Sequence, residues 1–212
     1  MPSLKGLFMK LPGFTIPEIN LLPSQGICVL YENFLSYEVA NDLFKLLLDQ
    51  TEWKQLKIKI FGKELDQPRL TEWYGVEGYS YSGIRLEPNM MPPELCKLQE
   101  KLSEKCAYSF NSVLLNLYRN ERDSMGWHSD DEKELGSNPT IASISLGAPR
   151  VFQIKHKTDK EKKYKLVLNH GSLLCMSGSM QHYWQHAVPK AHAQTGPRIN
   201  LTFRQINNHL KI

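Results

Sequence analysis

The clearest strand in the sequence is PRINLTFRQ, residues 197–205. Apolar and polar side chains alternate along it, so one face carries Ile199, Leu201 and Phe203. The opposite face carries Arg198, Asn200, Thr202 and Arg204. Two arginines on one strand face indicate a carboxylate ligand, because the planar guanidinium binds a carboxylate bidentately. The alternative is a surface strand with salt-bridged arginines. Six residues of straight strand span about 20 Å, so both arginines reach one small ligand only if strand twist and long side chains bring them together.

The short-strand pattern extends from this segment back to residue 111. Strands separated by clusters of Gly, Pro, Asn or Asp are predicted at residues 112–119, 141–146, 150–157, 163–168, 172–176, 183–188 and 198–206. Two helices come before them, one capped by Ser36 and ending near Asp49, the other opened by Pro92 and Pro93. Residues 1–26, rich in Pro, Gly and Asn, are expected to form an irregular arm. The pattern predicts an α+β fold that is mainly β, a sandwich or jelly roll with helices on one side.

Length and composition fit one globular domain. The 212 residues are 41% hydrophobic and 23% charged, which excludes collagen-like, coiled-coil and wholly disordered chains. No apolar run reaches the roughly 18–20 residues of a membrane span, and the N-terminus lacks a signal-peptide cleavage site. The four cysteines form no C-x-x-C pair, which is typical of a reducing compartment. We therefore expect a soluble intracellular protein with no membrane partner, cytoplasmic in a bacterium or nuclear in a eukaryote.

Positive charge is concentrated in one segment. Residues 155–165, KHKTDKEKKYK, contain six lysines against Asp159 and Glu161, a local charge of +4 that equals the net charge of the whole chain. Clustered lysine indicates a polyanion partner. A solvated hairpin tip explains the segment equally well.

A candidate metal site lies in GWHSDDEKELG, residues 126–136. On an extended chain His128 and Asp130 point to the same side, about 7 Å apart, so both can reach one ion. An H-x-D pair with one distant histidine is the facial triad of Fe(II) oxygenases, although most such pairs are surface coincidences. The sequence pattern alone does not decide which later histidine is the third ligand. The candidates are His156, His170, His182, His186, His192 and His209. A zinc-protease helix at 182–186 is rejected because it lacks the glutamate.

Taken together, these segments resemble the AlkB family of Fe(II)/2-oxoglutarate-dependent nucleic-acid dealkylases. The resemblance runs from about residue 60 to 206 and is closest to the vertebrate AlkB homologues that repair methylated DNA bases. It rests on NLY at 116–118, HSDDE at 128–132, IASISLGA at 141–148, HGSLL at 170–174, QHAVP at 185–189 and PRINLTFR at 197–204. PRLTEWYG, NLYRN and WHSDDE look like the homologue that favours single strands, and IFGK at 60–63 like the hydrophobic finger of the one that favours duplex.

The resemblance implies a double-stranded β-helix, one compact domain overall. Residues 1–110 would form the N-terminal extension, helices and nucleotide-recognition lid, and residues 111–212 the catalytic core. Fe(II) would be held by His128, Asp130 and His186, the last chosen because it stands twelve residues before Arg198, as in the family. The co-substrate 2-oxoglutarate would be held by Asn116, Tyr118, Arg198, Asn200 and Arg204.

Substrate-binding residues are also implied by the resemblance. Tyr81 would stack on an extruded base opposite His128, with Tyr79 on the same strand face. Arg69 would be a lid residue near the substrate, and Glu132, or Asp131 in its place, would contact the base edge. Phe61, on a lysine-bearing turn, is a candidate wedge between stacked bases.

The implied reaction uses O₂ and 2-oxoglutarate, yields succinate and CO₂, and demethylates 1-methyladenine or 3-methylcytosine with release of formaldehyde. The expected protein is a monomer that acts on single-stranded or duplex DNA, and on RNA as a further substrate. Three alternatives stay open: an RNA or protein-side-chain oxygenase, a non-catalytic nucleic-acid-binding module on the same fold, and a zinc hydrolase. The complete set of candidate metal ligands and arginines argues against the non-catalytic module. The sequence has no suitably spaced glutamate to act as acid or base, which disfavours the zinc hydrolase.

Overall fold

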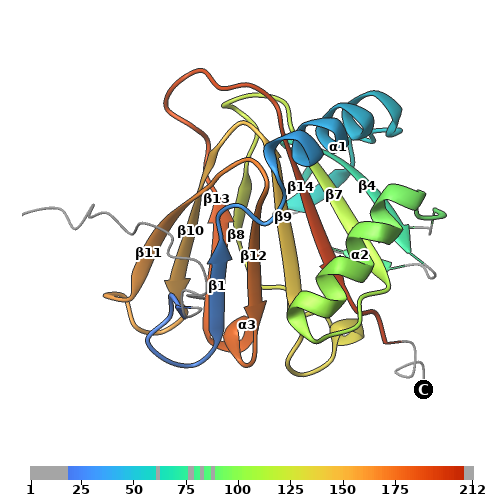
Figure 1. The fold of residues 1–212 in the computed structure, drawn as a ribbon. Coiled ribbons are helices and arrows are strands. Elements are labelled where there is room, and N and C mark those ends of the chain that lie inside the picture. The colour runs from blue at the N-terminus through green and yellow to red at the C-terminus, as the bar shows by residue number, and fades with distance from the viewer. Residues whose placement is uncertain (1–18, 61–62, 76–78, 82–83, 87–88, 208–212) are drawn as a thin grey trace, which may run out of the picture.

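Two antiparallel sheets face each other in the computed structural model, which describes residues 19–60, 63–75, 79–81, 84–86 and 89–207. The larger sheet has the order β1 (Ile27–Tyr31), β12 (Ser172–Ser177), β9 (Ile141–Gly147), β14 (Arg198–Arg204), β7 (Ser112–Tyr118) and β4 (Leu70–Gly75). The smaller sheet has the order β11 (Lys163–Leu168), β10 (Arg150–His156), β13 (Trp184–Val188) and β8 (Met125–His128). In Figure 1 the edge strand β11 of the smaller sheet lies at the left, and the larger sheet extends to the right toward α1 and α2. This arrangement confirms the predicted jelly roll.

The last strand in the described residues, β14, lies inside the larger sheet. β14 pairs with β7 over seven residues and with β9 over six, so its backbone is hydrogen-bonded on both sides. The predicted strand at 198–206 is therefore confirmed, two residues shorter. The other predicted strands also form, each with ends within about one residue of the expected ones.

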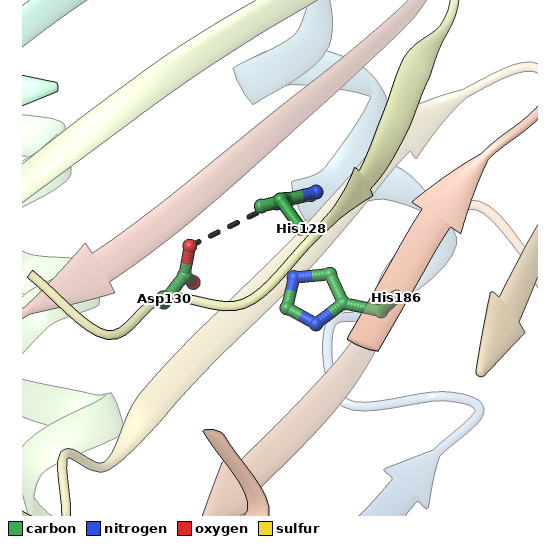
Figure 2. Close-up of side chains that lie close together, drawn as sticks. All are labelled: His128, Asp130 and His186. Atoms are coloured by element: carbon green, nitrogen blue, oxygen red, sulfur yellow. Dashed lines mark ion pairs between the residues drawn. The ribbon is translucent and has the colours of Figure 1, made fainter. Parts of the chain in front are cut away.

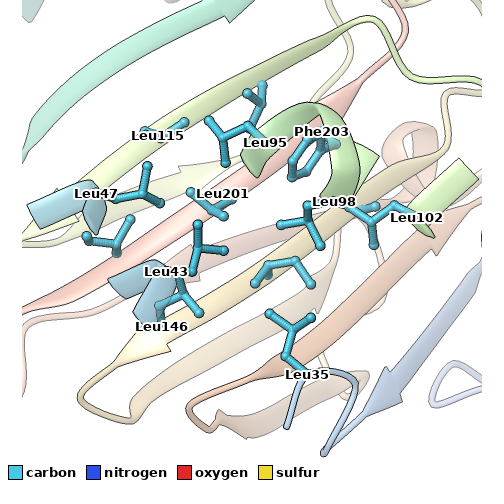
Figure 3. Close-up of a cluster of buried hydrophobic side chains, with 14 of the residues drawn as sticks. Leu35, Leu43, Leu47, Leu95, Leu98, Leu102, Leu115, Leu146, Leu201 and Phe203 are labelled. Carbon is cyan, nitrogen blue, oxygen red and sulfur yellow. The ribbon is translucent and has the colours of Figure 1, made fainter. Parts of the chain in front are cut away.

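Helices α1 (Tyr37–Gln50) and α2 (Pro93–Cys106) cover the outer face of the larger sheet (Figure 1). Ser36 caps α1 through its hydroxyl, which accepts a hydrogen bond from the Val39 amide. Leucines of both helices pack on the apolar residues of β14 (Figure 3): Leu43, Leu47, Leu95, Leu98 and Leu102 against Ile199, Leu201 and Phe203. Because the apolar face of β14 meets the helices, its polar face points between the two sheets.

The inner faces of the two sheets form a second core. Leu114 of β7 and Met176 of β12 belong to the same buried cluster as Phe152 of β10 and Trp184 of β13. Polar side chains interrupt this cluster near its centre, where the candidate site lies. Among the described residues, no helix has the length and apolar character that crossing a membrane requires.

Several elements were not predicted from the sequence. β1 and β4, at the two edges of the larger sheet, come from before residue 110, and β8 ends at His128, the first residue of the H-x-D pair. The described residues also form two small hairpins, in which β2 (Lys57–Ile60) pairs with β3 (Lys63–Asp66) and β5 (Tyr79–Tyr81) pairs with β6 (Ile84–Leu86). A 3₁₀ turn at Lys133–Leu135 and a one-turn helix α3 (Met180–Tyr183) complete the described elements.

Candidate metal and 2-oxoglutarate site

Two histidines face each other across neighbouring strands of the smaller sheet. His128 of β8 is the direct cross-strand partner of His186 of β13, and their ring centroids lie 4.2 Å apart. The register shifts just beyond this pair, so that Met125 as well as His128 lines the cavity between the sheets. Such a bulge redirects side chains. It leaves Trp127 on the outer face, 41% exposed.

Asp130 completes the cluster from the loop after β8. Its carboxylate is 1% exposed, and Oδ1 lies 3.8 Å from Nε2 of His128 (Figure 2). The backbone amide of Asp130 donates a hydrogen bond to Oε1 of Gln181, which fixes the loop. The metal-ligating atoms of His128, Asp130 and His186 all lie within 4.8 Å of one another. The structure thus brings together the three residues that the sequence analysis named.

The protonation states of the cluster suit a divalent cation. Burial raises the pKa of Asp130, but the charges of Arg204, His186 and His128 outweigh it and lower the pKa to about 2. Burial, followed by the charge of His128, lowers the pKa of His186 to about 3, and burial also lowers the pKa of His128. At neutral pH the three groups are therefore one carboxylate and two neutral imidazoles, the forms that bind metal.

Hydrogen bonding also leaves metal-binding atoms available. Nδ1 of His128 lies 2.9 Å from the Gly126 carbonyl, which fixes the ring and leaves Nε2 for a ligand. Oδ1 of Asp130 and Nδ1 of His186 are buried with no hydrogen-bond partner. Buried polar atoms without partners are costly, and a bound cation would satisfy them. The donor set fits Fe(II), which takes two histidines and one carboxylate and keeps positions for other ligands.

A row of polar side chains leads from the metal cluster along the inner face of the larger sheet. Asn200 on β14 lies between Asn116 on β7 and Ser145 on β9, because the three are cross-strand partners. The residues that line this side of the cavity are Asn116, Tyr118, Ser143, Asn200, Thr202 and Arg204. Apolar side chains of Met125, Phe152, Met176 and Val188 line the rest. A small polar ligand would therefore lie along β14, shielded from solvent.

Arg198 lies at the far end of this row from the metal cluster. It is 1% exposed, and its Nη2 donates to Ser145 Oγ at 2.9 Å and to Asn200 Oδ1 at 2.6 Å. Its Nε and Nη1 are buried without a hydrogen-bond partner. Burial lowers its pKa to about 10, so the guanidinium is still charged at neutral pH. A buried cation with two unused donors fits the carboxylate of an incoming ligand.

Arg204 occupies the other end and contacts the metal cluster directly. Its Nη2 lies 3.1 Å from Oδ2 of Asp130, and both side chains are almost fully buried. The two arginines of the strand are thus separated along the site, as the strand length predicts. Tyr118 lies under Arg198, whose guanidinium carbon is 5.1 Å from the ring centroid.

The structure describes the residues predicted to bind the substrate in less detail than the metal and co-substrate residues. Arg69 is buried, and its Nε donates to Asn116 Oδ1 at 2.8 Å, so it contacts the row of polar side chains. Glu132 is half-buried at the start of the 3₁₀ turn and is not among the residues that line the cavity. Tyr79 and Tyr81 begin and end β5, where their backbones pair with Leu86 and Ile84. Phe61 lies outside the described residues.

Three residues beside the site were not singled out from the sequence. Gln181 orients the Asp130 loop, and Phe152 stacks on His186 with ring centroids 5.3 Å apart. Arg150 is 3% exposed and donates to the carbonyls of Asp123 and Pro189. Alternation along β10 places Arg150 and Phe152 on the inner face, which is the one sequence signal that identifies them.

Two histidines and a carboxylate between the sheets of a jelly roll, beside a buried arginine, define an iron- and 2-oxo-acid-dependent oxygenase. The sequence profile of the 2OG-Fe(II) oxygenase superfamily matches residues 27–204, and the chain belongs to this superfamily. Its cofactor is Fe(II), with 2-oxoglutarate and O₂ as co-substrates.

Within the superfamily the chain is a member of the AlkB family. It is 43% identical over 200 residues to alpha-ketoglutarate-dependent dioxygenase alkB homolog 3 of Bos taurus, covering 89% of this chain and 70% of the relative. It is 33% identical over 202 residues to DNA oxidative demethylase ALKBH2 of Homo sapiens, covering 90% and 77%. The solved structure of OsALKBH1 matches with a TM-score of 0.62 at 19% identity, covering 84% of this chain and 97% of that one, and so shares the fold.

Proposed function

We propose that this protein is a dioxygenase that removes N-methyl groups from bases in DNA, acting on 1-methyladenine and 3-methylcytosine. The observation that carries the proposal is the cluster of His128, Asp130 and His186 between the two sheets, in the same site as the unpartnered donors of Arg198. Relatives at 33% and 43% identity are named as a DNA oxidative demethylase and an alpha-ketoglutarate-dependent dioxygenase.

The residues of the chain have separate tasks in this reaction. His128, Asp130 and His186 would hold Fe(II), which together with 2-oxoglutarate and O₂ supplies the oxidising power to hydroxylate an N-methyl group. Arg198 would bind the far carboxylate of 2-oxoglutarate, while Asn116, Tyr118 and Asn200 line its path. The hydroxymethyl group would then leave the base as formaldehyde.

Arg204 and Phe152 would keep the site in its reactive form. Arg204 compensates the charge of Asp130 and orients its carboxylate. Phe152 stacks on His186 from the apolar side of the cavity and excludes water from that ring. Both residues are buried, so the surrounding side chains restrict their positions.

A basic surface on the smaller sheet supports a nucleic-acid substrate. Lys155 of β10 and Lys163 of β11 are direct cross-strand partners, and Lys165 lies on the same outer face. Like charges directly opposite each other destabilise a sheet. None of the three is in an ion pair within the described part of the chain, whereas Lys157 and Lys162 are. Nζ of Lys155 lies 4.4 Å from the ring centroid of the exposed Trp127. Phosphate groups would relieve the repulsion.

The decisive experiment measures formaldehyde release from oligonucleotides that carry 1-methyladenine or 3-methylcytosine. Single-stranded DNA, duplex DNA and RNA of one sequence are compared, with Fe(II) and 2-oxoglutarate present. We expect repair of DNA that is lost in His186→Ala and retained in His192→Ala, because His192 is exposed and outside the cluster. Turnover of RNA alone, or no turnover of any oligonucleotide, would contradict the proposal.

The basic surface is tested separately by salt dependence of binding to single-stranded DNA. Replacing Lys155 and Lys163 together by glutamine should lower the slope of log Kd against log salt by about 1.4, since each phosphate contact contributes about 0.7. The control replaces Lys45 and Lys97, which are exposed on the helices of the opposite side. Equal slopes for the two double variants would remove this surface from the binding site.

A further inference from the structure

Two cysteines that are far apart in the sequence meet on the outer side of the larger sheet. Sγ of Cys106 lies 3.1 Å from Sγ of Cys175, and the two residues are 69 positions apart. Cys106 is the last residue of α2, and Cys175 is on β12. Both thiols are half-buried. This contact plays no part in the metal site, and the proposed function does not depend on it.

The fold holds both thiols in place. Cys175 pairs with Val29 of β1 on one side and with Ala142 of β9 on the other, so its backbone lies inside the sheet. Alternation along β12 turns Cys175 toward the helices, while Leu174 and Met176 point between the sheets. The end of α2 is held against β1, because Nζ of Lys105 lies 4.2 Å from the Tyr31 ring centroid. The two sulfur atoms therefore face each other in the folded protein.

The contact is close to the geometry of a covalent bond. A disulfide has a sulfur–sulfur distance of about 2.0 Å, so the two atoms need to approach by about 1 Å. Thiols held this close have a high effective concentration for each other, which favours an internal disulfide over a mixed one. Neither thiol is at a helix N-terminus, so proximity provides the reactivity.

We propose that Cys106 and Cys175 form a reversible intramolecular disulfide when the protein meets a disulfide oxidant such as oxidised glutathione. One thiol loses its proton, and its thiolate attacks the oxidant, breaking the glutathione disulfide and releasing one glutathione thiolate. The other cysteine thiolate then attacks the mixed disulfide, forms the Cys106–Cys175 bond and releases the second glutathione. Two thiols lose two protons and two electrons, and one oxidised glutathione becomes two reduced ones.

The two other cysteines provide internal comparisons. Cys28 is fully buried in the inner core, and burial raises the pKa of its thiol to about 12, so it should not react in the folded protein. Cys96 is exposed on α2, and its sulfur contacts the Met91 carbonyl at 3.6 Å. We expect Cys96 to form a mixed disulfide with glutathione, in contrast to the internal bond at 106–175.

The disulfide should change stability in a measurable way. It would close a loop that contains β7, β8, β9, β10 and β11, which restricts the unfolded chain. For a loop of this length in a chain of this size we expect the oxidised protein to melt about 10 °C higher than the reduced protein. Dithiothreitol should reverse the increase.

The test treats the folded protein with oxidised glutathione and maps the products by non-reducing peptide mass spectrometry. We expect a cross-linked peptide pair containing Cys106 and Cys175, lighter than the sum of its parts by about 2 Da. The higher melting temperature should be absent in Cys106→Ser and in Cys175→Ser but present in Cys96→Ser. A sample oxidised in denaturant, where the thiols do not face each other, should lose the preference for this pair.

Two results would overturn the inference. In the first, Cys106 and Cys175 each carry glutathione or stay reduced while Cys96 reacts. In the second, the cross-link forms but the folded and denatured samples give the same yield of it. Either result would show that the folded structure does not direct this pairing, whether or not the protein demethylates DNA.

Discussion

Replacing Arg198 by alanine should weaken the use of 2-oxoglutarate without removing the metal site. Nε and Nη1 of Arg198 are buried and lack hydrogen-bond partners, so both are available to a carboxylate. A hydrogen bond to a charged group contributes about 1.5–3 kcal/mol. Two such bonds at the lower value amount to about 3 kcal/mol, which corresponds to roughly a hundredfold increase in KM for 2-oxoglutarate.

The assay measures succinate formation across a range of 2-oxoglutarate concentrations, and calorimetry measures binding of the same ligand with Mn(II) in place of iron. Arg198→Lys keeps the charge but loses the planar fork, so its KM should lie between those of the wild type and the alanine variant. Arg122→Ala is the matched control, because Arg122 is exposed and outside the cavity. A KM for the alanine variant within threefold of the wild-type value, in a folded protein, would refute the assignment of Arg198.

Three further changes test other parts of the molecule. Asp130→Ala should abolish turnover and iron retention, since it removes the anionic ligand, whereas Asp131→Ala should keep its iron in a metal analysis. Phe61→Ala should lower activity on duplex DNA at least about tenfold and leave single-strand activity within about twofold, because a wedge matters only where a stack must be opened; equal losses would count against the wedge. Burial raises the pKa of Asp123, but the hydrogen bonds from Arg119 outweigh burial and lower that pKa. The ionised carboxylate therefore stabilises the folded protein fully above the unfolded-state pKa of about 4, and this contribution is lost as the pH falls through the lower pKa of the folded state. The free energy of unfolding, measured in urea between pH 7 and pH 3, should therefore depend less on pH in Asp123→Asn than in the wild type. The same pH dependence in both proteins would contradict this.

The strands that carry the co-substrate residues were predictable because their signal is local. In β14 the alternation of apolar and polar residues identifies both the strand and the face that meets the ligand. The same holds for β7, where Asn116 and Tyr118 share the inner face with Leu114. The pairing of β7 with β14 could not be derived from the segments themselves, although the resemblance to a known family implied that residues of both strands hold one co-substrate.

The third metal ligand could not be identified from local sequence patterns. Six histidines follow the H-x-D pair, and spacing alone does not choose among them. In the structure the choice follows from one register position, at which His186 is the cross-strand partner of His128. A pairing between strands that lie about sixty residues apart leaves no local trace in the sequence.

The missed strands have a similar explanation. β1 pairs with β12 through contacts such as Ile27 with Ser177, which are 150 positions apart in the sequence. β4 contains the buried Glu72, which departs from the usual strand pattern. Its Oε1 accepts hydrogen bonds from Lys54, Asn89 and the Trp73 amide, and its Oε2 lies 3.1 Å from Nζ of Lys54, so its main partners come from elsewhere in the folded chain.

The central place of β14 has a consequence for how the protein is made. During synthesis the strands on either side of it, β9 and β7, leave the ribosome first, and each waits with an open hydrogen-bonding edge and uncovered leucines. Only when residues 198–204 emerge can the sheet be completed, and the same strand brings both arginines of the site. A nascent chain that stops before this point is expected to need chaperones or to be degraded, so assembly of the fold and of the co-substrate site become one event.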